Sequence, residues 1–167
     1  MKQHQMQSGI WAGLPAAVIA VIIGFLLSAV VPNSHAADKT WNGAGDGTTM
    51  SSVANWVGGV PPVGGTDSLI FDGTGAVINN DYAGSAGNAF AGIIFNAGAG
   101  AFTIHGNALY LSGGITNNSP NLQYFTNIVN LNGLGRIFNA AVGQMQFDAV
   151  SGGSYFLVKD GTNIVTF

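Results

Sequence analysis

The chain has 167 residues and a formal net charge of −3, with four Lys and Arg residues against seven Asp and no Glu. So few basic groups cannot neutralise a phosphate backbone, which argues against nucleic-acid binding. Cysteine is absent, so disulfide-bonded scaffolds and thiolate zinc sites are excluded as well.

Residues 1–36 have the pattern of a signal peptide. Lys2 precedes a long apolar run, and Ser34 and Ala36 stand at the −3 and −1 positions that a signal peptidase reads. Cleavage before Ala37 is therefore predicted. The alternative is an uncleaved membrane anchor, because residues 10–31 are nearly long enough to span a bilayer. Export of the remaining chain is expected under either interpretation.

Residues 37–66 are denser in Trp, Gly and Pro than the rest of the chain, with Trp41, Trp56 and the pair Pro61-Pro62. A stacked repeat protein needs an atypical end piece, because its first coil otherwise exposes an apolar face and an unpaired strand edge. We therefore expect an aromatic N-terminal cap over residues 37–66, built on the two tryptophans.

From residue 67 onward, short runs of alternating apolar and polar residues are separated by clusters of Gly, Asn and Ser. Phe102 and Ile104 are expected to point inward from one strand, and Thr103 and His105 outward. The same alternation predicts further strands around residues 109–111, 145–148, 156–158 and 164–167, with Phe156 and Val158 as the inward apolar positions of the third. Helix signals are nearly missing, because no window keeps a helical apolar spacing without a Gly break.

One hydrophobic phrase occurs three times, as Ile70-Phe71-Asp72, Ile94-Phe95-Asn96 and Ile137-Phe138-Asn139. The copies are 24 and 43 residues apart, so a unit of slightly more than twenty residues is predicted. A period of that size is typical of stacked β-coils, and it favours an all-β solenoid over residues 67–167. A β-sandwich has similar turn spacing and is the alternative. The strand pattern runs to Phe167 without a cap, so a truncated solenoid is expected there.

Several phrases then carry a family resemblance: Thr40-Trp41-Asn42-Gly43, Ala54-Asn55-Trp56, Gly58-Gly59-Val60-Pro61, Asp67-Ser68-Leu69-Ile70-Phe71 and Gly92-Ile93-Ile94-Phe95-Asn96. Over about residues 40–118 the chain resembles passenger-type proteins with autotransporter-associated β-strand repeats. The resemblance implies a right-handed parallel β-helix outside a Gram-negative-type cell, in a family that often ends in an outer-membrane barrel. That family is defined by repeats, so it implies no catalytic residue.

The acidic residues do not form a catalytic pair in the sequence. Asp67 and Asp72 are five positions apart, and this odd spacing would make them project to opposite faces of an unbroken strand. Together with Asp46 and Asp81 they are expected to be solvated carboxylates in turns. The loop at residues 43–47 contains one imperfect copy of a calcium-binding glycine-aspartate repeat, which needs tandem copies to bind the ion.

The remaining chemical candidates are also interpreted as structural. His105 is the only histidine after residue 36 and has no neighbouring ligand, and Ser112 and Ser119 lack a nucleophile-elbow context. Outward-pointing Tyr110 and the two tryptophans could stack against sugars, but packing is favoured for them. The turn asparagines are expected to form ladders between coils; they are Asn79, Asn80, Asn117, Asn118 and Asn139.

These observations lead to one function and one alternative. The chain is expected to be a non-enzymatic exported scaffold, a cell-surface or secreted stalk or adhesion protein without catalytic, cofactor-binding or metal-binding residues. Its expected partners are surface glycans or other cell-surface proteins, with end-to-end self-association, and the mature part is not expected to enter the membrane. The alternative is a polysaccharide-active enzyme or a carbohydrate-binding module on the same scaffold.

Overall fold

The computed structural model describes residues 37–167, apart from residues 134 and 153–155. The predicted signal peptide, residues 1–36, lies outside the described residues. Within the described chain the regular structure is strand, interrupted by short 3₁₀-helical turns. The turns are η1 (Val53–Asn55), η2 (Val57–Gly59) and η3 (Ala86–Asn88).

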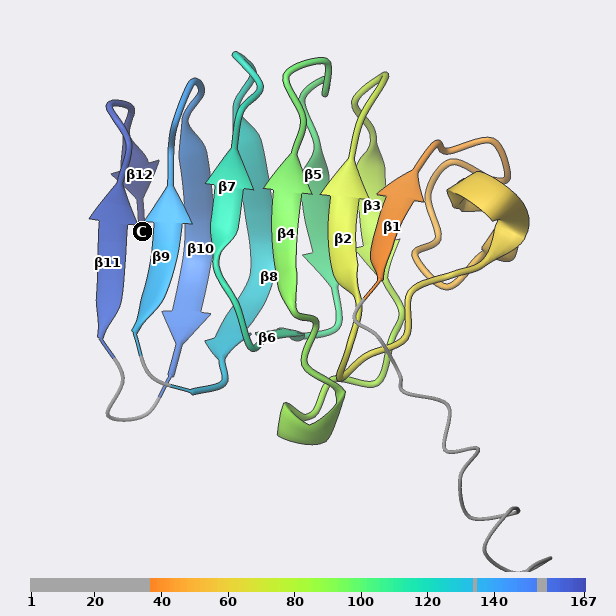
Figure 1. Ribbon diagram of the computed structural model, residues 1–167, viewed down its shortest axis with the longest axis horizontal. Coiled ribbons are helices and arrows are strands. Elements are labelled where there is room, and N and C mark those ends of the chain that lie inside the picture. Colours follow the sequence, from red (N-terminus) through yellow and green to blue (C-terminus); the bar gives the residue numbers. More distant parts are fainter. Residues whose placement is uncertain (1–36, 134, 153–155) are drawn as a thin grey trace, which may run out of the picture. The chain divides into compact units, whose positions relative to one another are not determined.

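One side of the fold is a six-stranded sheet in which every strand pair is parallel. In spatial order its strands are β1 (Asp38–Trp41), β2 (Ser68–Phe71), β4 (Gly92–Phe95), β7 (Ile115–Asn117), β9 (Arg136–Asn139) and β11 (Leu157–Asp160). We call this sheet A; it faces the viewer in Figure 1.

The opposite side is a second parallel sheet, which we call sheet B. Its strands are β3 (Val77–Asn80), β5 (Thr103–Gly106), β6 (Leu109–Leu111), β8 (Gln123–Leu131), β10 (Met145–Ser151) and β12 (Val165–Thr166). The long strand β8 pairs with both β5 and β6, because these two short strands follow one another along the previous coil.

The chain alternates between the two sheets and so forms a β-solenoid of about four turns. In Figure 1 it rises through sheet A, crosses to sheet B, descends, and advances from β1 towards β11, which makes the coil right-handed. Register partners in successive strands from β2 to β11 are 21 to 24 residues apart. The predicted parallel β-helix with a period slightly above twenty residues is therefore confirmed.

The three copies of the hydrophobic phrase are not all equivalent in the structure. Phe71 pairs with Phe95 in register, as the spacing predicts. Phe138, however, pairs with Ile115, whose other partner is Ile93, two residues before Phe95. A shift of two residues keeps the same side chains facing inward, so the interior accepts it.

A contiguous series of aromatic rings fills the interior. The rings in successive contact are those of Trp56, Trp41, Phe71, Phe95, Phe125, Phe147 and Phe138. The Phe102 ring packs beside this series, against both Phe71 and Phe95. Phe125 and Phe147 stack with their centroids 4.7 Å apart, and Phe138 stacks on Phe147 at the same distance. Burial of each ring contributes about 1.5–3 kcal/mol, and favourable ring geometry adds about 1 kcal/mol per pair.

The predicted facing holds for the central strands and is wrong for one strand near the C-terminal end. Phe102 and Ile104 are buried in the interior, and the strand at residues 156–158 exists as β11. Yet Phe156 is 65% exposed and Val158 is exposed as well, while Leu157 packs against the core. The register explains the difference, because it places Val158 opposite the outward-facing Ile137 of β9.

Small residues at the corners allow neighbouring coils to approach closely. A Cβ atom on Gly75 would overlap the main chain of Ala101 in the next coil, and one on Gly113 would overlap the carbonyl group of Ala91. Glycine is therefore required at these two positions for steric reasons.

Candidate functional site

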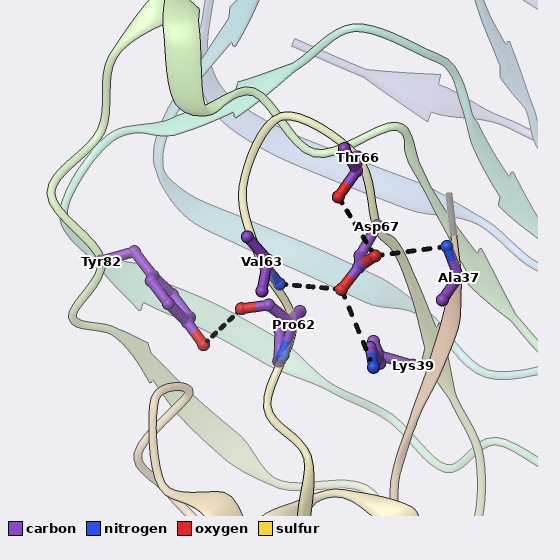
Figure 2. A network of polar contacts seen from close by, with 7 residues as sticks. All are labelled: Ala37, Lys39, Pro62, Val63, Thr66, Asp67 and Tyr82. Carbon is purple, nitrogen blue, oxygen red and sulfur yellow. Dashed lines mark hydrogen bonds and ion pairs between the residues drawn. The ribbon is translucent and has the colours of Figure 1, made fainter. Parts of the chain in front are cut away.

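The one buried carboxylate among the described residues belongs to Asp67, directly before β2. Only 4% of this residue is exposed. Its Oδ1 atom accepts hydrogen bonds from the Ala37 N–H at 3.2 Å and the Thr66 hydroxyl at 3.3 Å. Its Oδ2 atom accepts the Val63 N–H at 2.9 Å and lies 3.9 Å from Nζ of Lys39 (Figure 2). The expectation that Asp67 is a solvated turn carboxylate is therefore wrong.

The main chain of Asp67 extends the same junction into the next coil. Its N–H donates to the Val63 carbonyl at 3.2 Å, and its own carbonyl accepts the Ala91 N–H at 2.9 Å. Asp67 thus joins the segment before β1, the loop before β2 and the segment before β4. Burial is tolerated because hydrogen bonds and a cation compensate the lost hydration of the carboxylate.

A cleft of about 420 Å³ opens beside this junction. Its lining residues are Pro62, Val63, Gly64, Tyr82, Ala83, Asn88 and Phe90. The Tyr82 hydroxyl donates to the Pro62 carbonyl at 3.0 Å (Figure 2), and the Tyr82 ring meets Phe90 edge-on at 5.4 Å. Burial, and secondarily the charges of Asp81 and Asp67, raise the pKa of Tyr82 to about 12. The phenol therefore stays neutral and serves as a polar edge on an apolar wall.

A second, shallow depression of about 400 Å³ lies mainly along the strands of sheet A. Its floor includes Gly92 and Gly114, and the single carboxylate among its lining residues is that of Asp160. Glycosidic bond cleavage ordinarily requires two carboxyl groups about 5–9 Å apart. The lining of this depression contributes one carboxyl group, that of Asp160, where two are needed.

The remaining acidic candidates each bind a nearby part of their own scaffold. Asp72 accepts the Asn96 side-chain amide from the next coil at 3.0 Å, and this bond, followed by the Gly73 N–H, lowers the pKa of Asp72. Asp81 accepts the Ser51 N–H at 2.9 Å. Asp67 and Asp72 lie at opposite ends of β2, so the structure does not bring them together as an acid–base pair.

The glycine-rich loop at residues 43–47 is organised by Asp46 and Asn55. Asp46 Oδ1 accepts the N–H groups of Thr48 and Thr49 at 2.9 and 2.8 Å. Bonds from the Thr49 side chain and main chain, then from Thr48 and Asn55, hold the pKa of Asp46 well below its ordinary value. The described residues contain no group of three or more His, Asp or Glu placed to hold a metal ion.

Asn55 belongs to one of the phrases that carry the family resemblance, and its role in the loop was not predicted from the sequence. The residue is completely buried. Its Oδ1 atom accepts the N–H groups of Gly45 and Gly47 at 2.9 and 3.0 Å, and its Nδ2 donates to the Thr49 carbonyl at 2.9 Å. The available signal was the position of Asn55 beside Trp56, between the turn-forming pairs Ser51-Ser52 and Gly58-Gly59. Sequence spacing does not reveal that the side chain is buried.

The histidine and serine candidates are dispersed. His105 lies on β5 with its neighbour Ile104 buried, so it faces outward as predicted. Ser119 is buried and donates to the Ala99 carbonyl, and the Ser112 hydroxyl donates to the Phe90 carbonyl at 3.2 Å. Both hydroxyls hold a main-chain carbonyl of the preceding coil.

The aromatic candidates are packing residues. Trp41 and Trp56 are buried and meet edge-to-face at 5.2 Å, and the Trp56 Nε1–H donates to the Met50 carbonyl at 2.7 Å. Tyr110 is half-buried on β6 and its ring covers Gly84, where a Cβ would overlap the ring. Sugar stacking on the two tryptophans would require them to leave the core.

Side-chain amides join the coils, but not by the mutual ladders expected from the sequence. Asn80 donates to the Asn107 carbonyl at 3.0 Å, and Asn117 donates to the Gln144 carbonyl at 3.0 Å. In each case the acceptor is the main chain of the following coil. Corner carbonyls lack a partner in the sheets, so amides satisfy them.

The fold and these contacts define the class of protein as a parallel β-solenoid whose polar side chains join its coils. Comparison with protein-family models, with curated proteins and with solved structures gives no match. Within the described part of the chain, we find no helix with the length and apolarity that crossing a bilayer requires.

Proposed function

We propose that this chain is an exported, non-enzymatic repeat scaffold that acts as a stalk or adhesion module at a cell surface or in the secreted state. The supporting observation is that aspartate side chains, which could take part in catalysis, hold loops and coils together instead. Asp46, Asp67, Asp72 and Asp81 all accept hydrogen bonds from their own loop or from other loops and coils of the scaffold. Carboxylates used in this way support a rigid rod and are not free to act as an acid and a base.

The architecture suits a role that depends on reach. The chain alternates between the two sheets and each coil contacts mainly its neighbours, so the length of such a rod scales with the number of repeats. The ring series continues from Trp56 to Phe138, which ties successive coils into one core. A secreted scaffold without cysteine requires this kind of continuous packing.

The location is proposed from the N-terminal segment and from the resemblance to passenger-type proteins with autotransporter-associated β-strand repeats. The −3 and −1 residues Ser34 and Ala36 support export across one membrane. The phrases from Thr40-Trp41-Asn42-Gly43 onward support surface exposure on a Gram-negative-type cell.

Protease accessibility on intact cells tests the proposal. An antibody against residues 37–167 should detect a product that externally added protease removes without cell lysis, or a product released into the medium. A cytoplasmic marker protein in the same cells is the control. Full protection of the product, together with its co-fractionation with that marker, would contradict the proposal.

A further inference from the structure

The first described residue donates a hydrogen bond to the buried carboxylate of Asp67. The Ala37 main-chain nitrogen lies 3.2 Å from Oδ1 of Asp67. In the unprocessed chain this nitrogen belongs to the peptide bond between Ala36 and Ala37, which is the bond that the signal-peptidase pattern marks for cleavage. The donor of this hydrogen bond is thus the atom that processing would change.

Cleavage alters the chemistry of this contact. Signal peptidase uses water to break the C–N bond between Ala36 and Ala37, which leaves a carboxylate on Ala36 and an α-amino group on Ala37. A free α-amino group is largely protonated at neutral pH and carries a positive charge with three N–H donors. A neutral N–H···O bond is thereby replaced by a charge-assisted bond, which is roughly twice as strong.

We propose that Asp67 is the binding site of the mature amino terminus, and that processing before Ala37 forms an ion pair that fastens β1 to the rest of the solenoid. This inference rests on the export part of the proposed function. It adds a structural consequence to that export: the processed chain is more stable than a chain whose α-amino group is blocked.

The hydrogen bonding of Asp67 leaves room for such a partner. Oδ2 already accepts the Val63 N–H at 2.9 Å, whereas Lys39 Nζ is 3.9 Å away, too far for a hydrogen bond. Oδ1 has two long contacts, to Ala37 at 3.2 Å and to the Thr66 hydroxyl at 3.3 Å. An ammonium group typically approaches a carboxylate to about 2.8 Å, so Oδ1 can accept a closer and stronger bond.

The position of Ala37 in the sheet holds the terminus near this carboxylate. The Ala37 carbonyl accepts the Ser68 N–H at 3.0 Å, and the next residue, Asp38, begins β1 in register with Ser68. β1 is the edge strand of sheet A, where chain ends fray most readily. A pair with a carboxylate that is only 4% exposed is screened less by water than a surface pair, so it resists this fraying.

The experiment begins with the exported wild-type product and with Asp67→Asn and Asp81→Asn variants. Asp81→Asn is the matched control, because Asp81 also accepts a main-chain N–H from a residue 30 positions away, that of Ser51. Intact mass establishes the first residue of each product. Half of each sample is then acetylated at the α-amino group under mildly acidic conditions, which spare lysine. Urea titrations compare the blocked and free forms.

Acetylation is expected to raise the unfolding equilibrium constant about tenfold in the wild type and in Asp81→Asn, and by less than about twofold in Asp67→Asn. An equal effect in all three proteins, or none in the wild type, would overturn the inference. An exported product that begins at another residue would overturn it too, while leaving the exported scaffold intact. An unprocessed chain in the cytoplasm would overturn both.

If Asp67→Asn does not fold, the acetylation rate of the wild type decides the matter. Only the uncharged amine reacts, and an opposite charge nearby favours the charged form. We expect the α-amino group of the folded protein to react about tenfold more slowly than that of the peptide Ala-Asp-Lys-Thr. Equal rates would overturn the inference.

Discussion

Lys39 and Lys159 lie at the two ends of one row of register partners on the inward side of sheet A. The four positions between them are buried and apolar: Leu69, Ile93, Ile115 and Phe138. Lys39 lies beside Asp67, and Nζ of Lys159 donates to the Gly161 carbonyl at 2.6 Å. Inward-pointing charges on edge strands oppose the addition of another strand, and among the described residues the first and last strands of sheet A each carry one.

Replacing the lysine of β11 should therefore promote self-association. Lys159→Leu extends the apolar row to the exposed edge, beside the half-buried Leu157, and removes the charge that opposes strand addition. We expect dimers or larger species by light scattering after gel filtration, with Lys159→Arg remaining like the wild type. A wild-type protein that already associates as strongly as Lys159→Leu would contradict this role and would instead support the predicted end-to-end self-association.

The interior position of Phe102 can be tested against its outward neighbour. Phe102 is buried with its ring 5.2 Å from that of Phe71, so Phe102→Asp should abolish cooperative unfolding. Leu111→Asp should act in the same way, since Leu111 is completely buried. Thr103→Asp should cost less than about 1 kcal/mol, because Thr103 faces outward. Equal damage from the inward and outward changes in urea titrations would refute the assigned facing.

Asn55 should be among the most sensitive polar positions. Asn55→Ala leaves the N–H groups of Gly45 and Gly47 and the Thr49 carbonyl without their partner in a buried site. We expect a loss of about 3 kcal/mol in unfolding free energy. The control is Asn132→Ala, which removes a single bond to the Ala86 carbonyl and should cost about 1 kcal/mol or less. Similar losses in both variants would show that Asn55 does not organise the loop.

The carboxylate of Asp46 should make the fold sensitive to acid. Its pKa is lowered in the folded state, so its contribution is fully present above the unfolded pKa of about 4 and is lost as the pH falls through the lower folded value. The midpoint temperature of thermal unfolding of the wild type should therefore fall below about pH 4. Asp46→Asn should flatten this decline. An unchanged acid limb in the variant would contradict the assigned hydrogen bonds.

Assays on glycans separate the scaffold from the polysaccharide-active alternative. The wild type should release no reducing ends from pectin-like and other bacterial or plant glycans. Asp72→Asn and Asp160→Asn test two of the carboxylates that solvent can reach, and Asp67→Asn is informative only where circular dichroism shows that it folds. Cleavage that is lost in any folded variant would establish an enzyme and remove the non-enzymatic function.

The sequence predicted the solenoid because its dominant signals are local. Alternation around Phe102 and Ile104 assigned the interior of β5 correctly, and the spacing between Phe71 and Phe95 matched the coil. Phe138 was misplaced by two residues in register, because repeat spacing averages over corners of unequal length. The inward side of β11 was also missed, since Phe156 and Leu157 are both apolar and only the pairing with β9 distinguishes them.

The polar contacts were less predictable because they join residues that are distant in sequence. Asp67 looked like a turn carboxylate, yet a partner 30 residues earlier, Ala37, lies against it in the adjacent coil. Asn117 was expected to stack on other amides but donates to the Gln144 carbonyl, 27 residues later. Composition gives the number of such groups, whereas the coil register decides which of them meet.

The most direct test of the exported scaffold is the location and mass of the native product in intact cells. Surface digestion followed by intact-mass analysis of the undigested sample answers both questions in one preparation. We predict a product that begins at Ala37 and is removed by external protease or found in the medium. A chain that retains Met1, resists external protease and co-fractionates with cytoplasmic proteins would contradict the proposed function.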